Sequence, residues 1–138
     1  MARGRSRTTT EAEKGRVLFI DDEPDVVEPL VALARELGFA ATLLEDGTAF
    51  EAALADFRPT HVVVDLVMPQ IDGIDVLLSL ARLAARPQII VMTGYHWGVM
   101  ESARILAETH ALNDLQWLRK PVDLDLFETM LLAPKGAP

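Results

Sequence analysis

The sequence predicts an α/β fold in which helices cover both faces of a parallel sheet. From residue 17 onward, short β-branched runs alternate five times with segments whose apolar residues recur three and four positions apart. Half of the 138 residues are apolar, enough for one domain with a single substantial core. Strands that alternate with helices need right-handed crossovers, so the sheet is expected to be parallel and buried on both sides.

Each element follows from its own pattern. Strands are expected at 17–20, 39–44, 61–67, 87–93 and 114–118. Helices are expected at 24–38, 46–57, 74–86, 97–112 and 123–133, with a loop at 68–73. Gly38 is expected to close the first helix, and Pro29 either kinks that helix or marks a shortened first turn. We expect a disordered basic tail over 1–15, one folded domain over 16–133 and a flexible end over 134–138.

Charge is unevenly distributed along the chain. Residues 1–16 carry five basic and two acidic side chains, a net charge of +3, which leaves −11 on the rest of a chain whose total is −8. An acidic body argues against nucleic acid as the main ligand, although the basic tail could make a weak docking or nucleic-acid contact. Cysteine is absent, and neither a secretory signal nor an apolar run of membrane-spanning length is found, so we expect a cytoplasmic protein. The three histidines show no ligand spacing and are expected to be at the surface or half-buried.

Polar residues follow four of the predicted strands. They are Asp21 and Asp22 after the first, Asp65 after VVV of the third, Thr93 after the fourth and Lys120 after the fifth. Ligands of open parallel sheets bind at this carboxyl edge. Three carboxylates there repel one another, so a cation is needed. Oxygen-only donors favour Mg²⁺, or Mn²⁺, over Zn²⁺.

An aspartate beside such a metal, a lysine and a hydroxyl is equipped to attack phosphorus. The metal and the ammonium neutralise the transferring oxygens while the carboxylate becomes an acyl phosphate. Because an acyl phosphate is labile, it suits a signal better than a permanent modification. Strand-end caps and turn residues are the structural alternative for these side chains.

Four motifs in order resemble the receiver domain of two-component response regulators, over about residues 16–133. They are VLFIDDEPD, VVVDLVMPQIDG, IIVMTGY and LRKP. The resemblance implies a flavodoxin-like, doubly wound five-stranded sheet of strand order 2-1-3-4-5. It also implies a phosphoprotein of signal transduction that catalyses only its own phosphorylation and dephosphorylation.

The resemblance assigns roles to individual residues. Asp65 would accept the phosphoryl group from a sensor histidine kinase or a phosphotransfer protein. Thr93 would bond a phosphoryl oxygen and move toward it, and Lys120, followed by Pro121 in an often cis bond, would bridge phosphate and carboxylate. The implied metal ligands are Asp21, Asp22, Asp65 and the backbone carbonyl of Val67.

Three departures from the usual receiver pattern carry information. Thr93 and Lys120 are 27 positions apart, and the long segment between them is similar to receivers that precede EAL-type domains. Trp117 stands where receivers often carry a rotating Tyr or Phe, so it is either a switch residue or a fixed side chain on an edge strand. Val67 and Tyr95 are bulky and not strong bases, so we predict slow autodephosphorylation.

The leading hypothesis is a stand-alone, single-domain phospho-switch whose output is binding to an unknown downstream protein. The expected binding face comprises the fourth helix, the fifth strand and the fifth helix, with four apolar anchors: Ile105, Leu106, Leu124 and Phe127. A haloacid-dehalogenase-type phosphatase is the main rival, although its nucleophile would follow the first strand. A phosphorylation-independent receiver scaffold is the third possibility.

Overall fold

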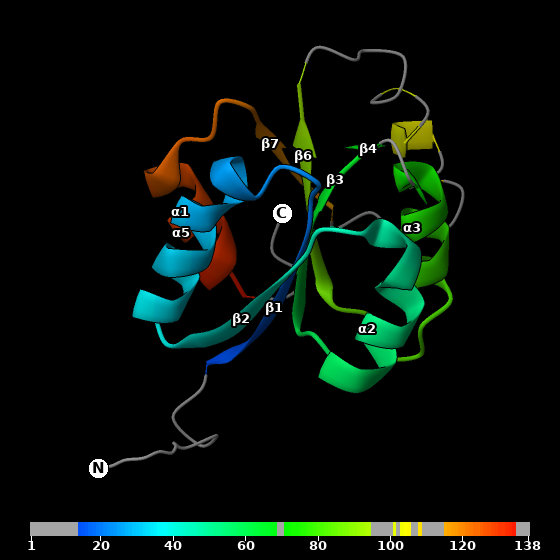
Figure 1. Ribbon diagram of the computed structural model, residues 1–138, viewed down its shortest axis with the longest axis horizontal. Helices are drawn as coiled ribbons and strands as arrows, with labels where there is room; N and C mark the ends of the chain where they lie inside the picture. Colours follow the sequence, from blue (N-terminus) through cyan, green and yellow to red (C-terminus); the bar gives the residue numbers. More distant parts are fainter. Residues whose placement is uncertain are drawn as a thin grey trace.

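The computed structural model describes residues 14–68, 71–94, 101, 103–105, 108 and 115–134, with one five-stranded sheet at its centre (Figure 1). Its strands are β1 (Gly15–Ile20), β2 (Phe39–Leu44), β3 (His61–Asp65), β6 (Gln88–Thr93) and β7 (Gln116–Arg119). Every pairing is parallel, and the order is β2-β1-β3-β6-β7. Counted along the chain this is 2-1-3-4-5, so the predicted doubly wound topology is confirmed.

Alternate strand residues enter two cores, one on each face of the sheet. In β3, Val62 and Val64 belong to one core and Val63 to the other. All five residues of β3 are buried, as a continuous β-branched run predicts for a central strand of a parallel sheet. The strand that ends at Asp65 is therefore held by packing on both sides.

Helices form the two outer layers. Helices α1 (Pro24–Glu36) and α5 (Leu124–Leu132) cover one face, and α2 (Phe50–Phe57) and α3 (Gly73–Ala81) cover the other (Figure 1). Phe127 of α5 is fully buried and packs near Phe19, with 6.1 Å between ring centroids. The prediction that Phe127 is a surface anchor is therefore wrong, whereas Leu124 and Ile105 are exposed.

Helix α1 shows how local sequence sets an element's limits. Pro24 occupies its first turn, where a missing N–H costs little, and Gly38 follows the helix with a φ of +101°. The helix continues through Pro29, whose ring faces solvent. Pro29 therefore does not shorten α1, which runs without a break from Pro24 to Glu36.

The third strand ends earlier than predicted. β3 stops at Asp65. Val67–Met68 (β4), which begins within the predicted strand, pairs in antiparallel fashion with Ile71–Asp72 (β5), which lies in the expected loop. Val67 is 41% exposed, so it lies outside the buried run that its sequence neighbours suggested. The apolar pattern continues past the end of the strand because Leu66 turns into the core while Val67 turns away from it.

Helices α2 and α3 differ from their predicted ranges by more than two residues. A 3-10 turn, η2 (Gly47–Ala49), precedes α2, and Asp46 begins it by accepting hydrogen bonds from the backbone N and Oγ1 of Thr48. Helix α3 ends at Ala81, and the residues from Leu83 to Arg86, although apolar enough to suggest helix, are non-helical. Pro87 disfavours helical geometry at Arg86, but it does not account for an end as early as Ala81.

Several predictions fall outside the described residues. They concern the basic tail before Lys14, Leu106, Tyr95, most of the helix over 97–112, and residues 135–138. Residues 101, 103–105 and 108 are helical, and Ala103 is buried in the core beneath α2 and α3. Among the helices that the structure describes, none combines the length and the apolar character needed to cross a membrane.

Candidate functional site

The carboxyl edge of the sheet gathers the polar residues singled out in the sequence. In the register, Ile20 pairs with Val64 and Thr93 pairs with Arg119. Asp21 therefore follows β1 beside Asp65, and Lys120 follows β7 beside the end of β6. Because neighbouring parallel strands end together, residues far apart in the chain meet here, as the sequence predicts.

Asp65 is buried but has partners on both carboxylate oxygens. Its Oδ1 accepts the backbone N–H of Val67 at 2.9 Å, and its Oδ2 accepts the Lys120 ammonium at 2.8 Å. A buried carboxylate without such partners would strongly destabilise a fold. The two hydrogen bonds explain how a carboxylate can close a strand made otherwise of valines.

Lys120 connects the ends of three strands. Its Nζ donates to Asp65 Oδ2 and also, at 3.2 Å, to Asp21 Oδ2, while its backbone N–H donates to the Thr93 carbonyl at 2.7 Å. The peptide bond to Pro121 is cis, the form that the resemblance implied. Burial alone would lower the pKa of Lys120, but the hydrogen bond and charge of Asp65, together with Asp21, outweigh burial and raise it.

Asp21 is the most deeply buried carboxylate of the group. Burial raises the pKa of its carboxyl above the ordinary value, and the negative charge of Asp65 adds to that effect. The backbone N–H of Glu23, which donates to Asp21 Oδ1 at 2.8 Å, and the ammonium of Lys120 oppose the rise. Burial is therefore the main cause of the raised pKa of Asp21, and the charges of Lys120 and Asp65 act on it in opposite directions.

The donor set suits a hard divalent cation. Asp21, Asp22, Glu23 and Asp65 each offer a carboxylate oxygen, and these atoms all lie within 4.8 Å of one another. Carboxylate oxygens without histidine or cysteine are the ligands that Mg²⁺ and Mn²⁺ accept. Glu23 was not among the predicted ligands, although the third acid of the run DDE was a visible signal for it.

The remaining predicted residues lie around this cluster. Thr93 is half-buried at the end of β6, and Val67 lies exposed two residues after Asp65. Trp117 of β7 is half-buried against the core of α2 and α3, and the Arg104 guanidinium carbon lies 5.7 Å from the centre of its ring. Tyr95 lies outside the described residues.

The class of protein is defined by a doubly wound sheet whose carboxyl edge brings together the buried Asp21 and Asp65 with the half-buried Asp22 and Lys120. The family described as the response regulator receiver domain matches residues 17–131, and the chain belongs to this family.

Known relatives agree with that assignment. The transcriptional regulatory protein FixJ of Bradyrhizobium diazoefficiens is 30% identical over 118 residues, covering 86% of this chain and 55% of FixJ. The DNA-binding response regulator MtrA of Mycolicibacterium smegmatis is 35% identical over 78 residues, covering 56% of this chain and 34% of MtrA. The chain thus spans about half the length of FixJ and about a third of MtrA.

The fold also has close counterparts among solved structures. A CheY-like response regulator receiver domain from Methylobacillus flagellatus superposes with a TM-score of 0.69 at 24% identity, covering 84% of this chain and 94% of that one. At this level of identity the likeness supports the fold alone.

Proposed function

We propose that this receiver domain is a phosphoacceptor switch in which Asp65 takes a phosphoryl group from a histidine kinase or a phosphotransfer protein. One observation carries the proposal: the Lys120 ammonium lies between Asp65 and Asp21, 2.8 and 3.2 Å from their carboxylates, at the carboxyl edge of the sheet. Membership in the receiver family favours this function over a haloacid-dehalogenase-type phosphatase.

The proposed reaction moves one phosphoryl group. A carboxylate oxygen of Asp65 forms a bond to phosphorus while the P–N bond to the donor imidazole breaks, and the imidazole nitrogen keeps the electron pair and takes a proton. Lys120, already in contact with Asp65, would follow the negative charge onto the phosphoryl oxygens. Thr93, at the end of the neighbouring strand, would donate its hydroxyl to one of these oxygens.

The acidic cluster would hold Mg²⁺ or Mn²⁺. Asp21, Asp22, Asp65 and the backbone carbonyl of Val67 are the proposed ligands. When bound, the metal would supply positive charge to the transferring oxygens. The cluster of four carboxylates beside the single Lys120 ammonium supports this assignment, because a divalent cation would balance the negative charge that one lysine leaves.

Phosphorylation would act by shifting a population of conformations. Thr93 moving toward the phosphoryl group would leave space for Trp117 to change its position, and a Trp117 fluorescence change on adding Mg²⁺ and a phosphate mimic would reveal it. Replacing Trp97 isolates the Trp117 signal. Unchanged emission would instead assign Trp117 to fixed packing on the edge strand.

The lifetime of the phosphoryl group is proposed to be long. Val67 and Tyr95, two positions after Asp65 and Thr93, cannot act as strong bases toward an attacking water. The double variant Val67→Asn with Tyr95→Glu should shorten the phosphoryl half-life, as followed by loss of the added mass. An unchanged half-life would contradict this role.

The output is proposed to be binding to a downstream protein through the face that includes β7, α5 and residues 103–105, where Ile105 and Leu124 are exposed. That the chain works as a single domain, in the cytoplasm and without nucleic acid stays a prediction. The named relatives include a DNA-binding regulator of which this chain matches only about a third.

Acetyl phosphate with Mg²⁺ tests the proposal. We expect one added phosphoryl group of about 80 Da in the wild type and none in Asp65→Asn. Sustained turnover of p-nitrophenyl phosphate would indicate a phosphatase instead. Unchanged partner binding and phenotype in Asp65→Asn would indicate a phosphorylation-independent scaffold.

A further inference from the structure

Glu23 places a third carboxylate against Lys120, on its solvent side. The Glu23 side chain is 59% exposed, and its Oε1 lies 3.5 Å from Lys120 Nζ, whereas the other two carboxylates around this ammonium are buried. Any phosphodonor that reaches Lys120 and Asp65 from solvent must therefore approach a site whose open side carries an additional negative charge.

The backbone of Glu23 begins helix α1, whereas its side chain contacts Lys120. Glu23 is the N-cap residue of α1: its carbonyl accepts the N–H groups of Val26 and Val27, and its own N–H donates to Asp21. Side chains at this helix position commonly accept a backbone N–H, but the Glu23 carboxylate makes no such capping bond. The side chain is thus directed to Lys120 rather than to the helix.

We propose that Glu23 is a positioning residue that holds the Lys120 ammonium toward the mouth of the site and repels small anionic phosphodonors. The inference rests on the proposed phosphorylation of Asp65. A dianion such as acetyl phosphate must displace the Glu23 carboxylate from Lys120 and approach it at close range. Glu23 thereby slows phosphorylation of Asp65 by small phosphodonors. A phosphodonor carried on a protein is favoured, because cationic side chains of that protein can neutralise Glu23.

The expected effect is modest because Glu23 is exposed. Interactions between solvent-exposed charges are weakened by water and salt, so Glu23→Gln should speed labelling by acetyl phosphate about threefold at low salt. The gain should shrink in about 0.5 M NaCl, because exposed charges more than a few ångströms apart are then largely screened from each other. It should also be smaller with phosphoramidate, which carries less net negative charge than acetyl phosphate.

The experiment compares the wild-type chain, Glu23→Gln and Glu28→Gln by the rate of mass increase on Asp65 with each donor. Glu28 is exposed on α1 outside the acidic cluster, so its variant removes the same charge elsewhere. Mg²⁺ affinity of the unphosphorylated proteins is measured in parallel by calorimetry. We expect faster labelling only in Glu23→Gln, with Mg²⁺ affinity changed by less than about threefold, the size of an exposed-charge effect.

Each other outcome overturns the inference. Equal rates in Glu23→Gln and wild type, or equal acceleration in Glu28→Gln, would exclude a specific role. Slower labelling with much weaker Mg²⁺ binding would make Glu23 a metal ligand instead. If wild type is labelled at Asp65, these results bear on Glu23 alone, whereas absence of labelling in all three proteins would overturn the proposed function as well.

Discussion

Strand β3 carries a buried titratable side chain at each end, and the two ends use such groups differently. Asp65 at the carboxyl end and His61 at the amino end are each only 6% exposed. Both oxygens of Asp65 have partners, one of them a lysine from another strand. His61 bonds through Nδ1 to Thr60 Oγ1 at 2.8 Å, but its buried Nε2 has no hydrogen-bond partner among the described residues.

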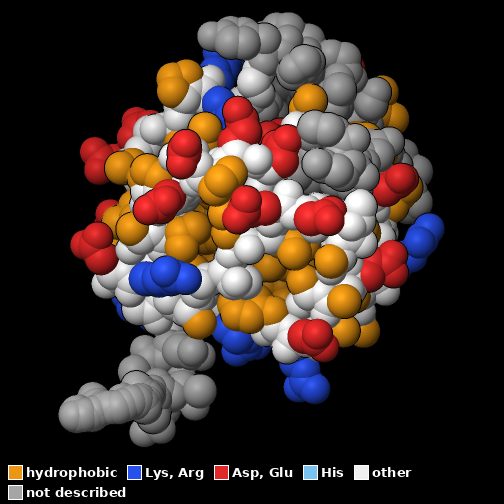
Figure 2. All heavy atoms as spheres, viewed as in Figure 1, with side chains coloured by type: hydrophobic (Ala, Val, Ile, Leu, Met, Phe, Trp, Pro, Cys, Tyr) orange, Lys and Arg blue, Asp and Glu red, His pale blue; other side chains and the backbone are white. Residues whose placement is uncertain are grey.

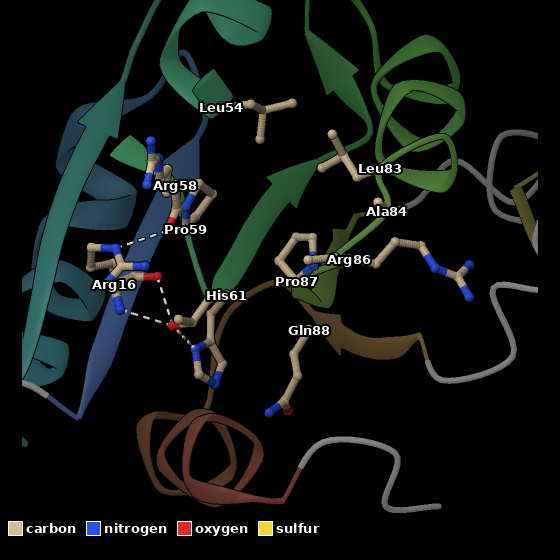
Figure 3. A pocket seen from close by; sticks show the side chains of 12 residues that line it. Arg16, Leu54, Arg58, Pro59, His61, Leu83, Ala84, Arg86, Pro87 and Gln88 are labelled. Atoms are coloured by element: carbon tan, nitrogen blue, oxygen red, sulfur yellow. Dashed lines mark hydrogen bonds between the residues drawn. The ribbon is translucent and has the colours of Figure 1, made fainter. Parts of the chain in front are cut away.

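The amino end opens into a groove of about 580 Å³, and two of its polar residues, Arg16 and Thr60, hold neighbouring elements together (Figure 3). Arg16 Nε donates to the carbonyls of Phe57 and Arg58, so it satisfies the end of α2. Thr60 Oγ1 accepts the backbone N–H of Arg16 and thereby ties β1 to the start of β3. In the view of Figure 2, acidic side chains are spread over most of the face, and basic side chains lie at its lower end, at its right edge and near its top.

The polar groups at the two ends of β3 have different roles. At the amino end, the Arg16 guanidinium satisfies two backbone carbonyls at the end of α2. At the carboxyl end, like charges are held together although they repel one another, which stabilises nothing by itself. An arrangement of that kind is expected where a cation or a phosphoryl group is to be bound.

The largest expected effect comes from removing the cation of the carboxyl end. Lys120→Met should lower the free energy of unfolding at neutral pH by about 2 kcal/mol, less than for a fully buried pair because Lys120 is partly exposed. Urea denaturation measures this, with Lys14→Met at the exposed amino end as the matched control. A loss no larger than in the control would contradict the account.

The pH dependence of that loss follows from Asp21. Burial raises the pKa of Asp21 in the folded protein. The contribution of this carboxyl to the free energy of unfolding is therefore fully present below its pKa in the unfolded chain, and it is lost as the pH rises through its pKa in the folded protein. Without Lys120 the folded pKa rises further. The penalty of Lys120→Met should therefore shrink as the pH is lowered, and Mg²⁺ should reduce it at neutral pH.

The next effect concerns the amino end. Arg16→Met removes the donor that closes α2 and should cost about 1 kcal/mol in unfolding free energy, with faster amide hydrogen exchange at the end of α2. Arg82→Met, an exposed arginine after α3, is the control. Labelling of Asp65 should be unchanged. Slower labelling in Arg16→Met would break the proposed separation between the two ends.

The smallest effect at neutral pH is expected at His61. Burial lowers the pKa of His61, with a weaker opposing effect from the backbone of Leu131, so the neutral ring is the stable form. The contribution of the neutral His61 ring to the free energy of unfolding is present above the pKa of His61 in the unfolded chain, and it is lost as the pH falls through its pKa in the folded protein. His61→Phe should therefore reduce the loss of stability between pH 7 and acid conditions. If the free energy of unfolding depended on pH in the same way in His61→Phe and wild type, the loss would come from other groups.

Much of the site could be predicted because strand ends follow from sequence. The β-branched runs before Asp21, Asp65 and Thr93 place these residues at one edge once the sheet is parallel. Lys120 follows in the same way from a shorter run, DLQWL. The parallel pairing of β1, β3, β6 and β7 then brings these residues together at the same edge.

Other features could not be read from the pattern. The run from Val62 to Met68 is apolar on both sides of Asp65, so the pattern alone does not show that β3 stops at Asp65 or that Val67 is exposed. His61 looked like a surface or half-buried residue, yet it is buried because Phe39 and α5 cover it. Phe127 and Leu124 both carry apolar side chains on one helix, and only the packing of α5 shows which one is exposed.

The central claim, that Asp65 is the phosphoacceptor, is tested most directly by chemical trapping. After incubation with acetyl phosphate and Mg²⁺, borohydride reduces an aspartyl phosphate to homoserine, and peptide mapping locates the changed position. We predict homoserine at position 65 in the wild type and at no position in Lys120→Met or Asp65→Asn under the same brief exposure. Homoserine at position 21 or 22, or none at all in the wild type, would contradict the account.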